Sequence, residues 1–416
     1  MNTFKKLAVA VALLTSVLAF SAGFSLLEQS TIGMGRSLAG MTAETDEPSS
    51  LFFNPSSVGF FDHPALTGGI HFLTGDVRIK DRGSTAVGEG SGDLEGWALI
   101  PNFSFVYPFE NGFSINFTSS ATSGARTIYP WDWRGRYAAV DTDVAVMEFQ
   151  PSISYQINED IAIGAGLILQ YAQMSIDQAL PTPSPLLPAV DTRMHLEGDT
   201  WAYGYSLGIT WKPLKKTTLG LAYRSQMSYD IDMSAKFRSG TAPNATVYSN
   251  IMGKDANCNL TFPQVVNFGI VQQLNDDWRI MADLSWTDWS VMKEMKMKFR
   301  TGVQSSEEMK WHDSWRIAVG TDYKLTDKWT LNFGGAIDEA AAQKYYHKTV
   351  KLPDCTRYWL SAGVSYQMTE NVRVDFSWMH LFYKSSRLHQ EVPNGVLEGK
   401  VVGYSDLASL GLRYDF

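Results

Sequence analysis

The sequence has little of what metal proteins and most enzymes use for their chemistry. It contains only two cysteines and seven histidines, and they lack the spacing of a metal site. No phosphate-binding loop accompanies them, so we predict no metal and no cofactor. Basic residues are also in the minority. The formal net charge is -8 at pH 7, which argues against a nucleic-acid partner.

Long hydrophobic runs are missing too, except at the N-terminus. Residues 1–21 place two lysines ahead of the apolar run LAVAVALLTSVLAF, which is the pattern of a secretory signal peptide. Small residues favour cleavage between Ser21 and Ala22. Beyond this point no segment reaches the roughly 18 consecutive apolar residues of a membrane-spanning helix. The mature chain is thus expected to be exported without helical membrane spans.

Aromatic residues and glycine are abundant instead. Aromatic residues make up 13% of the chain, with 13 tryptophans, and 34 residues are glycine. This composition suits a membrane β-barrel, whose strands need only about 9–11 residues each and whose interfaces collect aromatic side chains. A large secreted β-sandwich or a multidomain binding protein has a similar composition, so the pattern along the chain must decide between them.

Short turns recur along the chain, each with a polar centre flanked by aromatic or apolar residues. Their spacing leaves room for two strands and one longer loop between successive turns. Short turns at one end and long loops at the other are the asymmetry of an outer-membrane barrel. The six turns lie at 107–113, 155–161, 211–219, 272–278, 323–329 and 366–372.

The segments beside these turns alternate between two faces. In 201–211, aromatic and aliphatic residues share one face, small or polar residues share the other, and tryptophans stand at both ends. Segments 278–286 and 372–378 alternate in the same way. Tryptophan at both ends of an apolar face fits two interfacial girdles better than the buried face of a sandwich. The last strand ends on Phe416, which resembles the recognition signature of bacterial outer-membrane barrels.

We therefore predict an all-β protein, a 14-stranded antiparallel transmembrane β-barrel in the bacterial outer membrane. An even strand number suits a closed single-chain barrel. Strands are expected at 63–80, 97–109, 112–124, 142–157, 160–177, 193–212, 217–235, 259–274, 277–296, 309–325, 328–341, 355–368, 371–388 and 400–416. Longer loops are expected at 81–96, 125–141, 178–192, 236–258, 297–308, 342–354 and 389–399.

Residues 22–62 precede the first strand and carry a resemblance to a known family. The stretch IPNFSFVYPFENGFSINF at 100–117 is similar to that family's second and third strands. The family is that of the FadL-type transporters of long-chain fatty acids and aromatic hydrocarbons, and the resemblance covers essentially the whole mature chain. Its N-terminal motif residues are Ala22-Gly23-Phe24, Glu28, Gly33-x-Gly35-Arg36, Gly40 and Asn54-Pro55.

The resemblance implies a small N-terminal hatch at 22–62, inside the lumen of a barrel at 63–416. It implies passive uptake of hydrophobic small molecules, foremost long-chain fatty acids, with aromatic hydrocarbons as the alternative. Outer loops would capture the substrate, and a lumen pocket would hold it against Ala22, Gly23 and Phe24. The hatch motif residues would be Gly33, Gly35, Arg36, Asn54 and Pro55. Lateral exit at a kinked third strand would involve Ser119, Ser120, Thr122, Ser123 and Gly124.

The loop QALPTPSPLLPAV at 178–190 is unusually apolar and proline-rich for an extracellular loop. We expect it to form a capture groove with the loop 236–258, because an alkyl chain gains about 0.8 kcal/mol for each CH₂ that it buries. A rigid capping loop is the alternative. The residues predicted to line the groove are Leu180, Leu186, Leu187 and Val190.

The carboxylate of a fatty acid needs a cation. The arginines with inward parity lie near acidic residues, so they are predicted to form a structural ion-pair network rather than a ligand clamp. This leaves an uncharged substrate open. They are Arg224, Arg279, Arg316, Arg373 and Arg413.

Two further patterns bear on the function, namely a Gly-x-Ser-x-Gly stretch and the two cysteines. GYSLG at 204–208 matches the Gly-x-Ser-x-Gly nucleophile motif, but it lies within an alternating strand, so we predict no enzyme. Cys258 and Cys355 lie where outer loops enter strands in an oxidising compartment, so a disulfide and two free thiols are both open.

The expected partners of this monomer are a hydrophobic small molecule and outer-membrane lipids. A structural or adhesive surface barrel and a polar-solute porin remain alternative functions.

Overall fold

A computed structural model describes residues 25–90, 92–240 and 242–416. The signal peptide expected at 1–21 lies outside these described residues, and so do the predicted pocket residues Ala22, Gly23 and Phe24.

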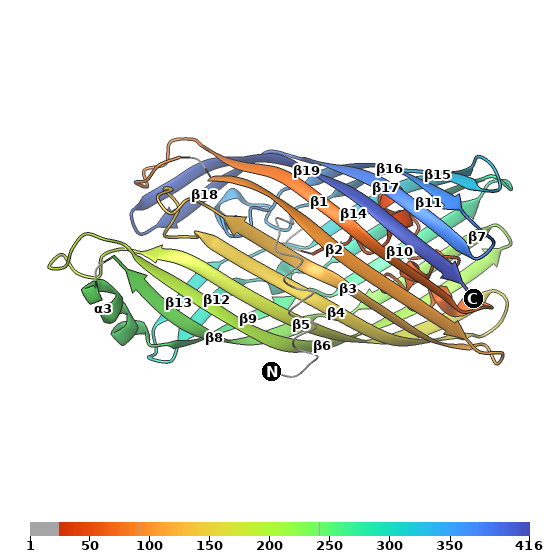
Figure 1. Cartoon of the computed structure of the whole chain (residues 1–416), viewed down its shortest axis with the longest axis horizontal. Helices are drawn as coiled ribbons and strands as arrows, with labels where there is room; N and C mark the ends of the chain where they lie inside the picture. The colour runs from red at the N-terminus through yellow and green to blue at the C-terminus, as the bar shows by residue number, and fades with distance from the viewer. Residues whose placement is uncertain (1–24, 91, 241) are drawn as a thin grey trace.

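The strands form one antiparallel sheet that closes on itself (Figure 1). Strand β1 (Ala65–Asp81) pairs with β2 (Gly92–Pro108) on one side and with the C-terminal strand β19 (Gly395–Asp415) on the other. In the described part of the chain, strand pairing therefore runs all the way around the ring, which is how a spanning sheet satisfies its backbone groups in a bilayer. This is the closed barrel that the alternating pattern predicted.

The wall contains the predicted 14 barrel strands, five of which are interrupted. The other uninterrupted strands are β3 (Phe113–Ile128), β4 (Asp141–Gln156), β5 (Ile161–Leu180), β6 (Thr192–Leu214), β15 (Trp329–Asp338) and β16 (Arg357–Gln367). The interrupted strands are β7 (Thr217–Arg224) with β8 (Met227–Ser239), β9 (Asp255–Phe262) with β10 (Val265–Gln273), β11 (Trp278–Thr287) with β12 (Glu294–Phe299), β13 (Gln304–Glu308) with β14 (Ser314–Lys324), and β17 (Val372–Tyr383) with β18 (Ser386–Val392).

The six short turns fall where they were predicted. They gather at the end of the barrel that holds the C-terminus, and the longer connections lie at the opposite end (Figure 1). We call these the turn end and the loop end. The asymmetry of the connections, which the sequence pattern predicted, is thus present in the structure.

Several predicted loops are shorter than expected because strands continue into them, and one of them contains a helix. The loop expected at 389–399 is largely a hairpin of β18 and β19. Strand β5 runs on to Leu180, which pairs with Thr192. The loop at 236–258 contains the helix α3 (Ala242–Met252). Within the described ranges, none of the helices has the length and apolar character needed to cross a membrane.

The outer face of the barrel is apolar and its inner face is polar. On β6, Tyr203, Leu207 and Trp211 are exposed outward, whereas Ser206 and Thr210 are buried toward the lumen. Aromatic rings meet across neighbouring strands near the turn end, as Trp329 and Tyr366 do with ring centroids 4.4 Å apart. Such a band suits the interface between lipid and water.

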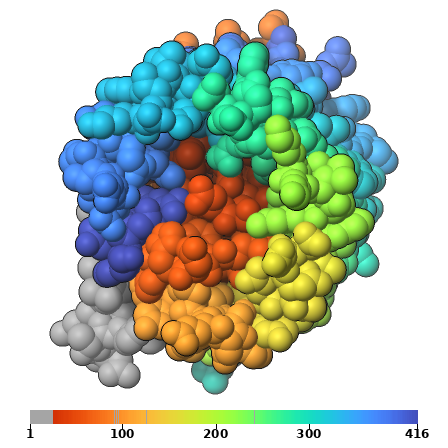
Figure 2. Space-filling model, turned by 90° about the vertical axis from the view of Figure 1, so that its right-hand side faces the viewer, coloured from red at the N-terminus to blue at the C-terminus, as the bar shows by residue number. Residues whose placement is uncertain are grey.

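Residues 25–62, which we call the N-terminal segment, lie inside the barrel. Figure 2 views the molecule from the turn end and shows this segment within the ring of strands. Its helical turns are α2 (Thr31–Gly35), η1 (Pro48–Phe52) and η2 (Ser57–Phe60). Ser30 caps α2, because its Oγ accepts a hydrogen bond of 3.1 Å from the backbone N–H of Gly33. All five residues of α2 are buried.

Glycines on the inner face of the wall make room for this segment. A Cβ atom on Gly334 would lie 2.1 Å from the carbonyl carbon of Arg36, and one on Gly220 would lie 2.0 Å from the carbonyl oxygen of Thr42. The segment's backbone therefore packs directly on the backbone of the wall, where only glycine fits.

We expect Gly334→Val to expel the N-terminal segment without preventing barrel assembly, because valine suits a strand but its side chain would overlap Arg36. Ion conductance of the purified barrel in planar bilayers should rise several-fold. The control is Gly335→Val on the outward face, where a Cβ has its nearest neighbour, the oxygen of Trp359, at 3.4 Å. Equal conductance of the two folded variants would contradict this packing argument.

Candidate functional site

The lumen contains a cavity of about 110 Å³ between the N-terminal segment and the wall. The segment contributes Leu26 and the aromatic pair Phe52 and Phe53, whose ring centroids lie 5.1 Å apart. The wall adds apolar side chains, Met227, Phe262 and Trp289, and polar ones, Gln170, Arg224, Arg316 and Asp338. The cavity is thus mostly apolar with a few convergent polar groups, which is typical of a small-molecule site.

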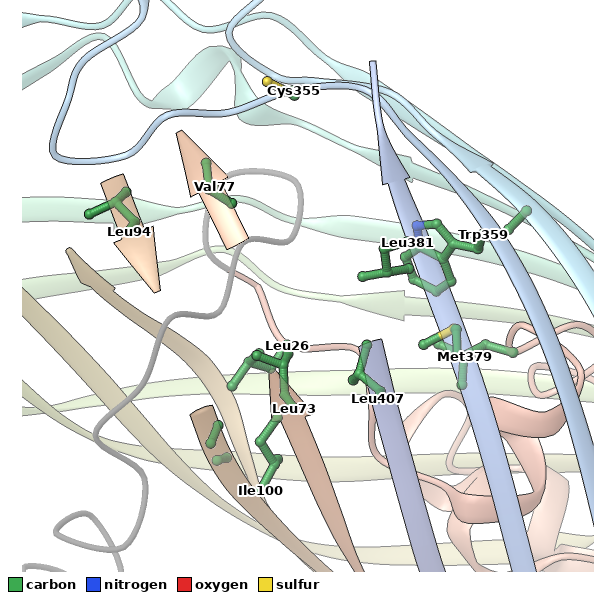
Figure 3. Close-up of a cluster of buried hydrophobic side chains, with 14 of the residues drawn as sticks. Leu26, Leu73, Val77, Leu94, Ile100, Cys355, Trp359, Met379, Leu381 and Leu407 are labelled. Atoms are coloured by element: carbon green, nitrogen blue, oxygen red, sulfur yellow. The ribbon is translucent and has the colours of Figure 1, made fainter. Parts of the chain in front are cut away.

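Ser25 and Leu26 of the N-terminal segment both line the cavity. Figure 3 shows Leu26 near Leu73, Ile100 and Leu407, with which it forms one buried hydrophobic cluster. The cluster holds Leu26 against the barrel wall. The predicted pocket residues Ala22, Gly23 and Phe24 lie outside the described residues.

The barrel wall is interrupted beside the cavity. Along β3, Ala121 pairs with Met147 and Ser123 with Val146, so Thr122 is an extra residue that forms a bulge. Among the described residues, the pairing of β2 with β3 ends at Asn102 and Ser120. Beyond that point β2 pairs with β1 alone. A gap in the ladder therefore separates β2 from β3 toward the loop end.

The start of the N-terminal segment takes the place of β2 at this gap. Ser25 forms an antiparallel bridge with Ser123, and the N–H of Leu26 donates to the carbonyl oxygen of Thr122 at 2.8 Å. A Cβ on Gly124 would lie 3.2 Å from Leu26 Cδ1. Of the five residues predicted for the lateral opening, Ser120, Thr122 and Ser123 are buried, and Ser119 and Gly124 are half-buried.

The hatch motif residue Arg36 is fully buried in an ion-pair cluster. Its Nη2 lies 2.7 Å from Glu44 Oε2 and its Nη1 lies 2.6 Å from Asp322 Oδ2. Arg279 binds the same two carboxylates, at 3.1 Å and 2.7 Å. Burial alone would raise the pKa of Glu44, but the charges of Arg279 and Arg36 lower it to about 2. Two cations and two anions thus join the segment to β11 and β14.

The hatch motif glycines, Gly33 and Gly35, lie where the N-terminal segment is tightly packed. A Cβ on Gly35 would lie 3.1 Å from the Cα of Gly363 on β16, so Gly35 marks a contact between segment and wall. A Cβ on Gly33 would lie 2.9 Å from Met41 Sδ, within the segment itself. Both glycines allow close packing that a larger residue would prevent.

Asn54 and Pro55 dock the second half of the segment. Asn54 Nδ2 donates to the carbonyl oxygen of Thr42 at 2.7 Å, and Ser154 Oγ donates to that of Pro55 at 2.6 Å. A Cβ on Gly208 would lie 1.9 Å from Asn54 Oδ1. This contact gives the GYSLG stretch a structural explanation, since its last glycine leaves space for Asn54.

Four of the five inward arginines form ion pairs, as predicted, and one does not. Arg224 lies 2.7 Å from Glu148, Arg373 contacts Asp375 and Glu47, and Arg413 contacts Asp415 and Asp46. Arg316 has no carboxylate within 4 Å in the part of the chain that the structure describes. Its Nη1 donates to the Ser37 oxygen at 3.4 Å, its Nη2 to Ser285 Oγ at 3.3 Å, and its Nε has no partner there.

The predicted capture loop is only partly assembled as a groove. Leu180 packs against the buried cluster at the loop end, and Leu187 is half-buried, but Leu186 is 93% exposed. The loop is tied to α3, because Asn244 Nδ2 donates to the carbonyl oxygens of Pro188 and Val190 at 3.0 and 2.9 Å. These contacts hold the loop beside the 236–258 region.

The two cysteines are free thiols, so the disulfide that the compartment allowed is absent. Cys258 on β9 and Cys355 ahead of β16 are both buried, and they belong to different hydrophobic clusters. Burial in apolar surroundings accounts for both residues as packing.

Several cavity residues were not among those predicted from the sequence. Phe52 and Phe53 stand in the apolar run before Asn54-Pro55, which was a usable signal. Met227 and Trp289 lie at strand interruptions, and no local pattern marked them as lumen residues.

Comparison with known proteins adds to this geometry. Residues 12–416 match the family described as outer membrane protein transport protein (OMPP1/FadL/TodX). The long-chain fatty acid transport protein of Salmonella typhi is 28% identical, with 96% of each chain covered. Outer membrane protein P1 of Haemophilus influenzae is 27% identical, over 89% of this chain and 87% of the other.

Solved structures share the fold. A Pseudomonas aeruginosa FadL homologue superimposes with a TM-score of 0.87 at 24% identity, covering 95% of this chain and 100% of the other. The toluene transporter TodX of P. putida gives a TM-score of 0.69 at 16% identity, covering 94% and 99%. The barrel is therefore similar along almost its whole length.

We expect Arg36→Met to weaken docking of the N-terminal segment by about 3–5 kcal/mol, because it leaves an excess carboxylate buried. Protease accessibility of the segment across a urea series, in the folded barrel, would measure the loss. The control is Arg78→Met, which removes an exposed ion pair with Asp76 and should cost about 1 kcal/mol or less. Equal accessibility in both variants would show that the buried pairs do not hold the segment.

Proposed function

Because this chain belongs to the outer membrane protein transport family (OMPP1/FadL/TodX), we propose that it imports long-chain fatty acids passively. The family consists of transport channels, so the protein is an outer-membrane transporter and not an enzyme. The turn end then faces the periplasm and the loop end faces the cell exterior. Relatives named long-chain fatty acid transport proteins support a fatty acid, and structures of toluene transporters support the alternative of aromatic hydrocarbons.

The observation that favours an acid is the environment of Arg316. This guanidinium is 5% exposed and lines the cavity, and no described carboxylate pairs with it. The carboxylates nearest to it belong to Asp283 and Asp338, and neither lies within 4 Å. A buried cation without a direct ion pair is costly, and a ligand carboxylate would supply that pair. An uncharged hydrocarbon would leave Arg316 without a direct ion pair, so the cavity suits a molecule with one anionic group and an apolar body.

The proposed route connects the three regions described above. The loop around Leu180 captures the substrate, the cavity beside Phe52 and Phe53 binds it, and the gap between β2 and β3 releases it sideways. Ser25 and Leu26 occupy that gap, so release requires them to leave β3. Among the described residues, the bonds to be broken are the bridge of Ser25 to Ser123 and the contacts of Leu26.

The alternative functions make different demands on the lumen. A structural or adhesive barrel needs no cavity behind its wall, and a polar-solute porin needs a continuous wet pore. The mostly apolar cavity and the lumen-filling segment favour hydrophobic transport over both.

The proposal is tested by uptake of labelled oleate and toluene in a deletion strain that carries either the wild-type gene or Arg316→Met. The wild-type gene should restore oleate uptake. Arg316→Met should lower it by about tenfold or more, since a charge-assisted hydrogen bond contributes about 1.5–3 kcal/mol. Arg300→Met, on an 82% exposed side chain at the loop end, serves as control and should change nothing.

The outcomes separate the candidates. Restored toluene uptake with no effect on oleate would replace the fatty acid by an aromatic hydrocarbon. No uptake of either compound would leave the structural barrel as the better explanation. Equal loss of both compounds in Arg316→Met would remove the carboxylate role of Arg316.

We expect Gly124→Phe to reduce oleate uptake at least fivefold, because a large side chain beside Leu26 would fill the gap. Barrel assembly should be normal, as judged by heat-dependent gel mobility. Gly68→Phe on β1 provides the control, since a Cβ there has nothing closer than 3.7 Å and faces away from the cavity. Unchanged uptake by the folded Gly124→Phe variant would exclude this site as the exit.

A further inference from the structure

The outer part of the interrupted strands has the opposite polarity from the membrane-spanning part. On β7, Leu221 is exposed and Ala222 is buried, as expected of a strand in lipid. After the break, β8 buries Met227 and Met233 and exposes the polar residues between them. The inward positions move from even to odd residue numbers across the break, so the apolar face turns to the inside.

Neighbouring strands repeat this arrangement. Strand β9 buries Cys258 and Leu260, and β12 buries Met295 and Met297 while exposing Lys298. A polar outer surface around an apolar interior is the pattern of protein in water. These strand ends therefore extend beyond the lipid and enclose an apolar interior above the cavity.

Methionine dominates this interior. Nine of the 16 methionines belong to one buried cluster, and each of them is at most 9% exposed. We call them the methionine cluster: Met174, Met194, Met227, Met233, Met252, Met292, Met295, Met297 and Met309.

The cluster joins the loop end to the cavity. At its inner end, Met227 lines the cavity together with Trp289. At its outer end, the cluster contains Met252, the last residue of α3, and Leu180 of the capture loop packs against it. Figure 1 shows α3 at the loop end of the barrel. A substrate that passes from the loop to the cavity must therefore displace these side chains.

The cavity itself is small for a fatty acid. Its volume of about 110 Å³ is below that of an engineered cavity of about 150 Å³ that admits benzene. Side chains around it must move before a long alkyl chain fits. Methionine is the side chain best suited to such movement, because it is unbranched, has three rotatable bonds and repacks around irregular shapes.

We infer that the methionine cluster is an adaptable gate that sets which shapes of hydrophobic acid reach the cavity. This inference rests on the proposed function. Flexible methionines admit both straight and bulky chains, whereas branched side chains of similar volume would admit the straight ones and hinder the bulky ones.

The test combines Met233→Leu, Met292→Leu, Met295→Leu and Met297→Leu, which belong to the cluster but do not line the cavity. It compares uptake of palmitate with that of pyrene-labelled dodecanoic acid. Palmitate uptake should stay within twofold of wild type, and uptake of the bulky pyrene acid should fall at least fivefold. Met281→Leu with Met379→Leu is the control, because both residues are buried outside the cluster. It should import both acids as the wild type does.

Leucine and methionine have similar volumes, so the barrel should assemble, and heat-dependent gel mobility would verify it. The double variant Met233→Leu with Met295→Leu replaces the fourfold variant if that one fails to assemble. An unchanged ratio of the two uptakes in the folded variant would overturn the gate, and so would an equal fall of both. Failure of the wild type to import either acid would instead overturn the proposed function.

Discussion

Charges and backbone groups inside a barrel must find partners where bulk water is largely excluded, and this constraint governs the present structure. Arg36, Glu44, Asp322 and Arg279 meet it together, because each charge has two opposite partners within about 3 Å. Such a cluster is weak evidence for added stability, but removing one member is costly. It therefore fixes the position of the N-terminal segment, and with it the position of Leu26, Phe52 and Phe53 at the cavity.

The wall is adapted to the segment in the same way. Gly208, Gly220 and Gly334 lie where the segment's atoms approach so closely that no side chain fits. Those glycines deprive the strands of side-chain packing, and the docked segment supplies the missing contacts instead. Segment and wall thus depend on each other, and the only part of the segment that replaces a wall strand is its start, at Ser25 and Leu26.

The barrel was predictable because its signal is local. Alternation with period two, an apolar outer face and short turns can be read within ten residues, and they gave the strand number and the six turns. The strand interruptions were not predicted, because the apolar face of the strand turns from the outside of the barrel to its inside beyond the lipid. This change occurs between Leu221 and Met227. The bulge at Thr122 lies in the stretch where the family resemblance predicted a kinked third strand. The surroundings of Arg316 were not predicted, because they depend on residues far away in the chain. The ion-pair prediction was right for four of the five arginines. It was wrong for Arg316, because the acid opposite it in the barrel register, Asp338, pairs with Arg357 instead.

In the proposed function, binding and release compete for the same apolar surface. A ligand shifts a conformational equilibrium only through its different affinity for the two states. The closed state has a cavity of about 110 Å³ with Leu26 on one side, so an alkyl chain gains most from a state in which Leu26 has moved away. Each additional buried CH₂ contributes about 0.8 kcal/mol, and the bridge of Ser25 to Ser123 opposes it. Chain length would then decide how far the equilibrium moves toward the open gap, which links recognition of the alkyl chain to its exit.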